Sequence, residues 1–327
     1  MSTSKACLVR GSINIDEFYA LPHIVRPGET IASTGFSRKT GGKGANQAFA
    51  CGRAGGRVVL DGRIGGDGLA IRDSIAEGGV DVSRVKVVEG EVTGRAIIQR
   101  AADGENSIVL HAGANYAPSG ETTPDLTGFT HLLVQNEIPL EDTLAYLRAS
   151  GAAGLTSVYN PSPMPSPDIL RAFPWDCLSI LIVNEGELAS ILAAFDDTPL
   201  SASLSVADAS TAAMHALHRA KGFNDKIIIV TTIGPQGVLV LDPRGAGPHP
   251  EIASFPAAPV KKVVDTTGAG DTFAGYFTAL LMEKGDDASL AEIVPVCTQA
   301  CSLAVEKAGA MESIPARKDV EARLAAN

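Results

Sequence analysis

Short apolar segments alternate with helical segments from residue 131 to residue 284 of this chain. Apolar runs of this kind are typical of strands buried on both faces, and helices between such strands are typical of parallel sheets. The alternation therefore predicts an α/β fold, a three-layer sandwich with a central, mostly parallel sheet. The expected core strands cover residues 6–9, 58–60, 131–135, 156–159, 179–183, 227–231 and 238–241.

The expected helices lie between and after these strands. Pro295 falls inside the last expected helix, at residues 288–307. Because proline lacks a backbone N–H, we expect a kink or a break there. The helices are expected at residues 43–54, from Gly68 to about Glu77, and at 141–149, 185–195, 206–221, 271–284 and 288–307.

Two β-rich stretches do not fit the alternation. Residues 13–36 have strand character, and residues 93–111 are typical of a β-hairpin that turns at 103–106. We expect them to form a small separate sheet inserted into one domain that covers 1–327, because no linker divides the chain.

Composition excludes several other classes of protein. Hydrophobic residues make up 45% of the chain, which is ample for a large core. The net charge is −10 and no basic run is longer than a pair, which argues against a nucleic-acid partner. The first apolar run is too short for a secretion signal or a membrane span, so we expect a cytoplasmic protein. The five cysteines form no CxxC pair and are expected to be buried as small apolar residues.

Glycine is abundant, with 34 residues, and one glycine turn is especially informative. Residues 265–273 read Asp-Thr-Thr-Gly-Ala-Gly-Asp-Thr-Phe, between an expected strand and an expected helix. The first N–H groups of a helix lack partners, and glycines let an anion approach them closely. The turn therefore predicts an anion site with Asp271 at its edge, placed to accept a hydroxyl proton. The alternative is that Asp271 only caps the helix.

Two polar turns near the N-terminus offer hydrogen-bonding groups. Asn14 and Asp16 follow the first expected strand and are two residues apart, so on an extended chain they share a face suited to binding hydroxyls. Residues 41–48 read Gly-Gly-Lys-Gly-Ala-Asn-Gln-Ala and open a helix. Taken alone, the first stretch could be a polar loop, and the second a phosphate cradle or a plain helix cap.

Further polar motifs follow the later strands, where ligands bind in open α/β sheets. Asn184 and Glu187 stand three apart at a helix start, which suits either a Mg²⁺ site or a capping box. Residues 232–237 form a glycine turn that is either a nucleotide loop or an ordinary turn. Glu137 and Asn160 each follow a strand; a lone glutamate there is commonly just solvated.

From Val9 to Pro315 these motifs, in this order, resemble the ribokinase-like, phosphofructokinase-B-type carbohydrate kinase family. The chain has neither a P-loop nor a G-x-G-x-x-G motif. The resemblance implies the ribokinase-like fold and transfer of the ATP γ-phosphoryl group to the 5-hydroxyl of D-ribose. It implies that Asp271 is the base and that Gly268, Ala269 and Gly270 form the anion hole.

The resemblance also assigns ligands to this chain, with ATP, Mg²⁺ and K⁺ as cofactors. It implies a homodimer formed through a lid that the small sheet makes. The implied sugar-binding residues are Asn14, Asp16, Gly41, Gly42, Lys43, Asn46, Glu137 and Asp271. The implied nucleotide-binding residues are Asn184, Thr232, Gly234, Gly237 and Gly270. Mg²⁺ is assigned to Asn184 and Glu187, and K⁺ to Asp265, Thr267 and Ser313.

Two alternatives stay open at this point. The chain could be a kinase of the same family that acts on a deoxyribose, a ketohexose or an adenosine-like nucleoside, and the bulky Tyr116 in the substrate region leaves the sugar open. The other alternative is a non-catalytic sugar-binding regulator, against which the intact Gly-Ala-Gly-Asp string argues, since a binder needs no base.

Overall fold

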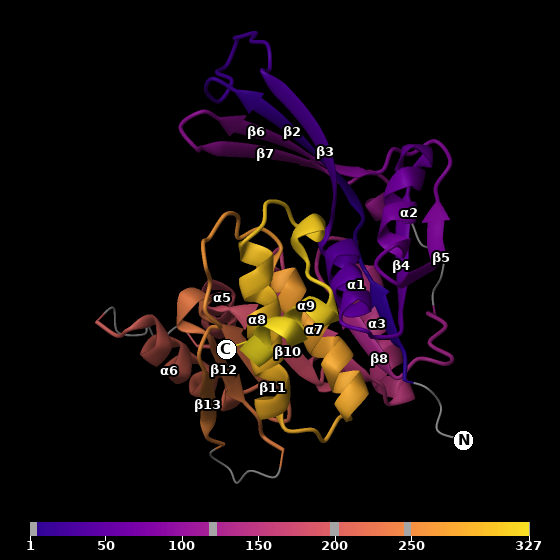
Figure 1. Ribbon diagram of the computed structural model, residues 1–327. Helices are drawn as coiled ribbons and strands as arrows, with labels where there is room; N and C mark the ends of the chain where they lie inside the picture. Colours follow the sequence, from indigo (N-terminus) through magenta and orange to yellow (C-terminus); the bar gives the residue numbers. More distant parts are fainter. Residues whose placement is uncertain (1–4, 118–122, 197–202, 245–249, 327) are drawn as a thin grey trace.

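The computed structural model describes residues 5–117, 123–196, 203–244 and 250–326 (Figure 1). In this part of the chain nine strands form the central sheet, in the order β13-β12-β11-β10-β9-β8-β1-β4-β5. All neighbours pair in parallel except β11 with β12 and β12 with β13. The strands are β1 (Cys7–Arg10), β4 (Val58–Ile64), β5 (Val80–Val87), β8 (His131–Val134), β9 (Thr156–Tyr159), β10 (Ile180–Asn184), β11 (Ile228–Thr232), β12 (Val238–Leu241) and β13 (Ile252–Phe255).

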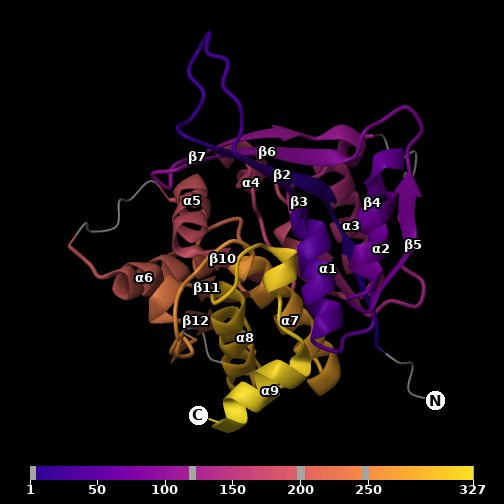
Figure 2. The same cartoon turned by 45° about the horizontal axis from the view of Figure 1, so that its top comes forward.

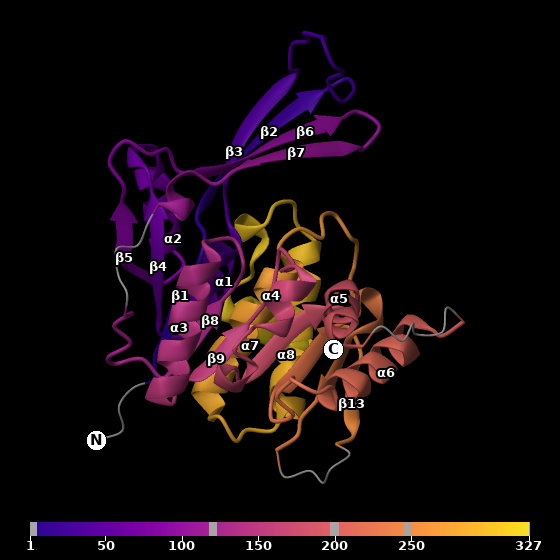
Figure 3. The ribbon, with the colours of Figure 1, turned by 180° about the vertical axis from the view of Figure 1, so that it is seen from behind.

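Helices cover both faces of this sheet, which confirms the three-layer sandwich. Successive strand residues belong to different cores: Ile180 and Ile182 pack in one cluster, and Leu181 and Val183 in the other. The first core contains α1 (Lys43–Arg53), α2 (Leu69–Ala76), α7 (Ala269–Lys284), α8 (Leu290–Val305) and α9 (Arg317–Ala326). The opposite face, seen in Figure 3, carries α3 (Leu140–Ala153), α4 (Pro167–Arg171), α5 (Glu185–Phe195) and α6 (Val206–His218).

The β-rich stretches form a separate four-stranded sheet, as expected, in the order β3-β2-β6-β7. This sheet projects from one end of the sandwich, and in Figure 2 it spans the top of the molecule. The sheet extends beyond the expected limit at residue 36, because its strand β3 (Gly35–Gly41) continues to the first glycine of the pair that precedes α1. The strands are β2 (Asn14–Leu21), β3 (Gly35–Gly41), β6 (Gly94–Ala101) and β7 (Asn106–His111).

Several details differ from the sequence expectations. Helix α8 runs without a break through Pro295, because its apolar face is buried against the core that α7 also lines. The edge strands β5 and β13 and the helices α4 and α9 were not expected, since each is short or has mixed polarity. All five cysteines are free thiols, and three of them, Cys7, Cys51 and Cys297, are buried. No helix within the described ranges has the length and apolarity needed to span a bilayer.

Candidate active site

Asp271 lies in the first turn of α7 and is 7% exposed. Its carboxylate accepts two hydrogen bonds from α1, from Asn46 Nδ2 at 2.9 Å and from Gln47 Nε2 at 2.9 Å. The two helices can approach this closely because of Gly275, where a Cβ would lie 2.4 Å from the Gln47 carbonyl oxygen. The capping alternative for Asp271 is wrong, because both carboxylate oxygens accept side-chain amides and the N-cap residue is Gly268.

The glycine turn before α7 adopts the conformation that its sequence suggested. Gly268 has φ +77°, and a Cβ there would lie 3.0 Å from Ala310 Cα, so the turn requires glycine. Within the described residues no side chain caps α7. Gly268 and Gly270 line a polar cavity together with Asp271, so the N-terminus of the helix opens on this space.

The polar cavity measures about 270 Å³ and lies between the carboxyl ends of the central strands and α7. Lys43, which the sequence grouped with the sugar ligands, also lines it. Burial acts to lower the pKa of Lys43, but the carboxylates of Asp271, Glu137 and Glu187 outweigh burial and raise the pKa above its usual value. The cavity thus holds an ammonium group among carboxylates. Its other lining residues are Asn160, Ser162, Ile182, Val183, Asn184, Glu187, Thr232, Gly268 and Gly270.

Asn184 and Glu187 form a capping box at the start of α5. Asn184 Oδ1 accepts from the Glu187 N–H at 2.8 Å, and Glu187 Oε2 accepts from the Asn184 N–H at 3.0 Å. Both side chains also line the polar cavity. The capping reading of this motif is therefore confirmed, and it leaves oxygen atoms at the cavity wall.

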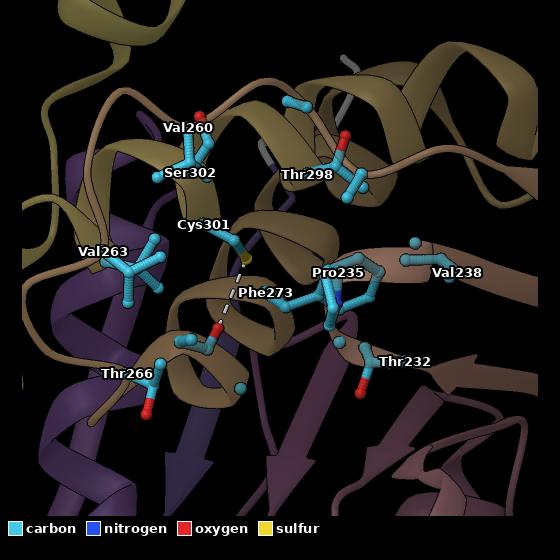
Figure 4. A pocket seen from close by; sticks show the side chains of 17 residues that line it. Thr232, Pro235, Val238, Val260, Val263, Thr266, Phe273, Thr298, Cys301 and Ser302 are labelled. Atoms are coloured by element: carbon cyan, nitrogen blue, oxygen red, sulfur yellow. Dashed lines mark hydrogen bonds between the residues drawn. The ribbon is translucent and has the colours of Figure 1, made fainter. Parts of the chain in front are cut away.

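A second cavity, of about 360 Å³, adjoins the first and shares Thr232 and Gly270 with it (Figure 4). Its wall is apolar, and Figure 4 shows side chains of α8 facing Phe273 of α7 across it. Gly234 and Gly237, from the turn for which a nucleotide loop and an ordinary turn were both open, line it. Pro235 of the same turn, and Thr266, Ala269 and Phe273 of the glycine motif before and in α7, line it as well. Sequence reasoning missed the rest, because the segment before that motif and the inner face of α8 carry no local signal. These missed residues are Val238, Ala257, Ala258, Val260, Val263, Thr298, Cys301, Ser302 and Val305.

Asn14 and Asp16 lie on β2, at the base of the small sheet. Asn14 pairs with Gly41 in the strand register, and a Cβ on Gly41 would lie 2.2 Å from Asp16 Oδ2. Burial raises the pKa of Asp16 to about 7, and the nearby carboxylates of Glu137, Glu312 and Asp271 add to the shift while Lys39 opposes it. The glycine at position 41 therefore makes room for a crowded, partly protonated carboxyl group.

Glu137 is held by the protein rather than merely solvated. Its Oε2 accepts from Ser12 Oγ at 2.6 Å and from the Lys43 N–H at 2.9 Å. Ser12 was missed by sequence reasoning, and so was the role of Asn115, which bonds both backbone groups of Ile13 and donates to Asn14 Oδ1 at 2.8 Å. These contacts tie the two N-terminal motifs to Glu137. Tyr116, by contrast, is 54% exposed.

Asp265 and Thr267 meet before α7. Asp265 Oδ1 accepts from the Thr267 N–H and from Thr267 Oγ1 at 2.6 Å, and Oδ2 accepts from the Gly309 N–H at 2.9 Å. Burial acts to raise the pKa of Asp265, but these hydrogen bonds lower it overall. Ser313 belongs to the same C-terminal segment, and its hydroxyl donates to the Ala310 carbonyl at 2.8 Å.

A buried ion cluster lies at the carboxyl ends of β1 and β4, and no local pattern in the sequence predicts it. Arg10, which is 1% exposed, donates to Asp142 Oδ2 at 2.5 Å, and Arg63 donates to the same oxygen at 3.1 Å. Asp61 accepts from the Tyr146 hydroxyl at 2.7 Å. The cluster joins the strand that leads to Ser12 with the helix that follows Glu137.

The site as a whole brings a buried carboxylate, Asp271, near a crowded set of polar groups around Asp16 and next to two adjoining cavities, one polar and one apolar. This combination is the one expected of a small-molecule kinase. Residues 4–317 match the model of the pfkB family carbohydrate kinases. The chain belongs to this family.

Relatives of known name and structure agree with this assignment. A ribokinase of Haemophilus influenzae is 35% identical over 324 residues, which cover 96% of this chain and 97% of that protein. The crystal structure of a ribokinase from Cryptococcus neoformans var. grubii serotype A in complex with ADP is similar with a TM-score of 0.90 and 51% identity, covering 98% and 100% of the two chains. An Arabidopsis thaliana ribokinase complexed with ribose and ATP has a TM-score of 0.78 and 27% identity, covering 98% of each chain.

Proposed function

We propose that this protein transfers the γ-phosphoryl group of ATP to the 5-hydroxyl of D-ribose and releases D-ribose 5-phosphate and ADP. The observation that carries the proposal is the position of Asp271, which is buried, held by two amides, and open to the polar cavity. The ribokinases named above support ribose and ATP as the substrates.

Asp271 is the base in this proposal and accepts the proton of the attacking hydroxyl. The backbone amides of Gly268, Ala269 and Gly270 stabilise the charge that develops on the transferred phosphoryl group, where most of the catalysis lies in such reactions. Lys43 adds a positive charge in the same cavity. Support for this division of roles comes from the shared lining of the cavity by Lys43, Gly268, Gly270 and Asp271.

The sugar is bound by the groups around Asp16. Asn46 Nδ2 donates to Asp271, and the buried Oδ1 of Asn46 has no hydrogen-bond partner within the described ranges. A buried acceptor without a donor is costly, and a sugar hydroxyl is a fitting donor. Asn14, Asp16, Gly41, Gly42 and Glu137 complete the set in our proposal.

The nucleotide is bound across the two cavities. The apolar cavity suits a purine ring, and the polar cavity suits the phosphates that extend from it. Thr232 and Gly270 line both cavities. We therefore place the junction between the adenosine part of ATP and its phosphates at these two residues. Gly234, Gly237 and Asn184 flank this path.

The residues present fit a Mg²⁺ ion that is completed by phosphate and water. Mg²⁺ favours one or two carboxylates with the remaining ligands from substrate and water. Asn184 and Glu187 offer such oxygens at the wall of the polar cavity, and no cluster of three or more acidic, His or Cys ligands occurs among the described residues. The ion would neutralise phosphate charge.

The residues present also fit a K⁺ ion. The hydroxyl hydrogens of Thr267 and Ser313 are committed to Asp265 and to the Ala310 carbonyl, so the oxygen lone pairs of both are left for a cation. With the Asp265 carboxylate they form an all-oxygen donor set. A cation there would support the backbone of the glycine turn without touching the substrates.

We further propose that residues 1–327 act as one kinase domain in the cytoplasm, with the small sheet as a lid that excludes water from the reaction. Ile108, Val109 and Leu110 on its edge strand β7 are 50%, 55% and 64% exposed. Exposed apolar edges are commonly covered by a second subunit, which supports a homodimer through the lid.

A coupled assay of ADP release across a panel of sugars, with ATP, Mg²⁺ and K⁺, tests the proposed function. We expect the highest kcat/KM for D-ribose. If a deoxyribose, a ketohexose or a nucleoside gave a clearly higher kcat/KM, that compound would replace D-ribose as the proposed substrate. Sugar binding without turnover of any panel member would identify a regulator instead of an enzyme.

A further inference from the structure

A chain of side-chain amides runs behind Asp271 and is not explained by substrate binding. Asn160 Nδ2 donates to the Ile182 carbonyl at 3.0 Å, and Gln47 Nε2 donates to Asn160 Oδ1 at 3.1 Å. The same Gln47 nitrogen donates to Asp271 Oδ1 at 2.9 Å. At the other end, Gln135 Nε2 donates to Gln47 Oε1 at 2.7 Å.

The direction of every bond in this chain follows from its first acceptor. A backbone carbonyl only accepts, so the Asn160 NH₂ group must face Ile182 and its oxygen must face Gln47. The Gln47 NH₂ group must then point toward Asn160 and Asp271, and its oxygen toward Gln135. Gln47 therefore has no freedom to flip its amide, and Asp271 always meets a donor.

The two glutamines of this amide chain are enclosed by the protein, while Asn160 is half-buried. Gln47 is 0% exposed and Gln135 is 1% exposed. A Cβ on Gly11 would lie 2.2 Å from Gln135 Oε1, so the glycine leaves the space that this amide occupies. Gln47 reaches Asp271 from α1, and Gln135, directly after β8, reaches Gln47; neither glutamine lines the polar cavity, whereas Asn160 does.

We propose that Gln47 is a positioning residue that fixes the plane of the Asp271 carboxylate, with Gln135 and Asn160 holding the Gln47 amide in its donor orientation. The inference rests on the proposed phosphoryl transfer and deepens it. Asn46 Nδ2 donates to Oδ2 and Gln47 Nε2 donates to Oδ1, so the orientation of the Asp271 carboxylate is fixed at both oxygens.

Three variants separate positioning from packing. Gln47→Met removes the donor at nearly constant volume, and we expect kcat to fall about 10- to 100-fold, as small misplacements of a reacting group do. Gln47→Glu places a second carboxylate against Asp271, so the acid limb of the kcat–pH profile should also move to higher pH. Gln135→Glu should also lower kcat, although residue 135 does not touch Asp271. A carboxylate at 135 would attract the Gln47 NH₂ group and draw it away from Asp271.

The matched control is Asn224→Asp, which changes an amide into a carboxylate at a site that lies in neither cavity. Asn224 donates to the Trp175 carbonyl at 3.2 Å, as Asn160 does to Ile182. We expect this variant to lose stability while its kcat and its pH profile stay at the wild-type values. KM for ATP should stay near the wild-type value in all the Gln47 variants.

A stability measurement makes the test independent of turnover. The double variant Gln47→Glu/Asp271→Asn exchanges the amide and the carboxylate and restores one donor facing one acceptor. Its midpoint of urea unfolding should exceed that of Gln47→Glu alone, although it lacks the base and stays inactive. Additive losses of stability, or wild-type kcat and pH profile in Gln47→Met and Gln47→Glu, would overturn the inference. Failure of ribose as substrate overturns only the proposed sugar, because the variants are compared on whichever compound the wild type accepts.

Discussion

The end of the site around Asp16, where we propose that sugar hydroxyls bind, and the proposed nucleotide end are built in opposite ways. Around Asp16 the protein fills the space itself, since a Cβ at Gly41 would lie 2.2 Å from the Asp16 carboxylate. At Gly270, between the two cavities, a Cβ would meet no atom within 4 Å. One end is a frame of paired side chains, and the other is open space that is polar in one cavity and apolar in the next. In our proposal, close packing determines where sugar hydroxyls bind, whereas the nucleotide end obtains its shape from elements that border an empty volume.

Asp271 joins these two ends, so the largest effect is expected there. Asp271→Asn keeps the shape of the side chain but removes the base, and we expect kcat to fall roughly 10²- to 10⁴-fold. Sugar affinity, measured by calorimetry without ATP, should change little. If the variant turned over at close to the wild-type rate, Asp271 would not be the base, and no catalytic group would link the two ends of the site.

The two glycines allow a matched test of the contrast itself. Gly41→Ala forces the Asp16 carboxylate to move, so we expect KM for the sugar to rise about tenfold or more while KM for ATP stays constant. Gly270→Ala meets no protein atom, so the fold should be unchanged and the loss should fall on KM for ATP and on kcat. Steady-state kinetics with each substrate varied in turn distinguishes the patterns, and equal effects on both KM values in both variants would contradict the contrast.

The crowding around Asp16 makes sugar binding depend on pH. Its pKa is raised to about 7 by burial and by neighbouring carboxylates, and the ionised form is the better acceptor for sugar hydroxyls. KM for the sugar should therefore fall about tenfold between pH 6 and pH 8. The stability effect has the opposite sign: the unfolded chain ionises near pH 4 and the folded chain near 7, so stability is lost as the pH rises between these values. Asp16→Asn should abolish both dependences and raise Tm at pH 8 but not at pH 4.

The sequence predicts much of the frame because the signals there are local. Apolar strands that alternate with helices predict the three layers, and the string around Asp271 predicts an anion site at the start of a helix. Strands β5 and β13 escape prediction because edge strands expose one side and so lack a continuous apolar run.

The rest of the site depends on contacts between distant residues. Gln47 stands inside a recognised motif, yet only the packing of α1 on α7 reveals that it holds Asp271. Arg10 and Asp142 are far apart in the chain and look like ordinary charged residues until the fold buries them together. The apolar cavity is assembled from β11, α7, α8 and the segment before α7, and no stretch of sequence contains its pattern.

The smallest effect is expected from the proposed monovalent cation, since it would support the glycine turn without contacting either substrate. Replacing K⁺ by Na⁺ at equal ionic strength should lower kcat roughly two- to tenfold, because the smaller ion fits the same oxygens less well and the glycine turn is held less firmly. The direct readout is stability without substrates: KCl should raise Tm more than NaCl, since an ion that binds only the folded chain stabilises it. Asp265→Asn should remove this difference. Equal Tm and equal kcat in the two salts would show that the hydrogen bonds of Asp265 alone hold the turn, and the open end of the site would then need no ion to keep its shape.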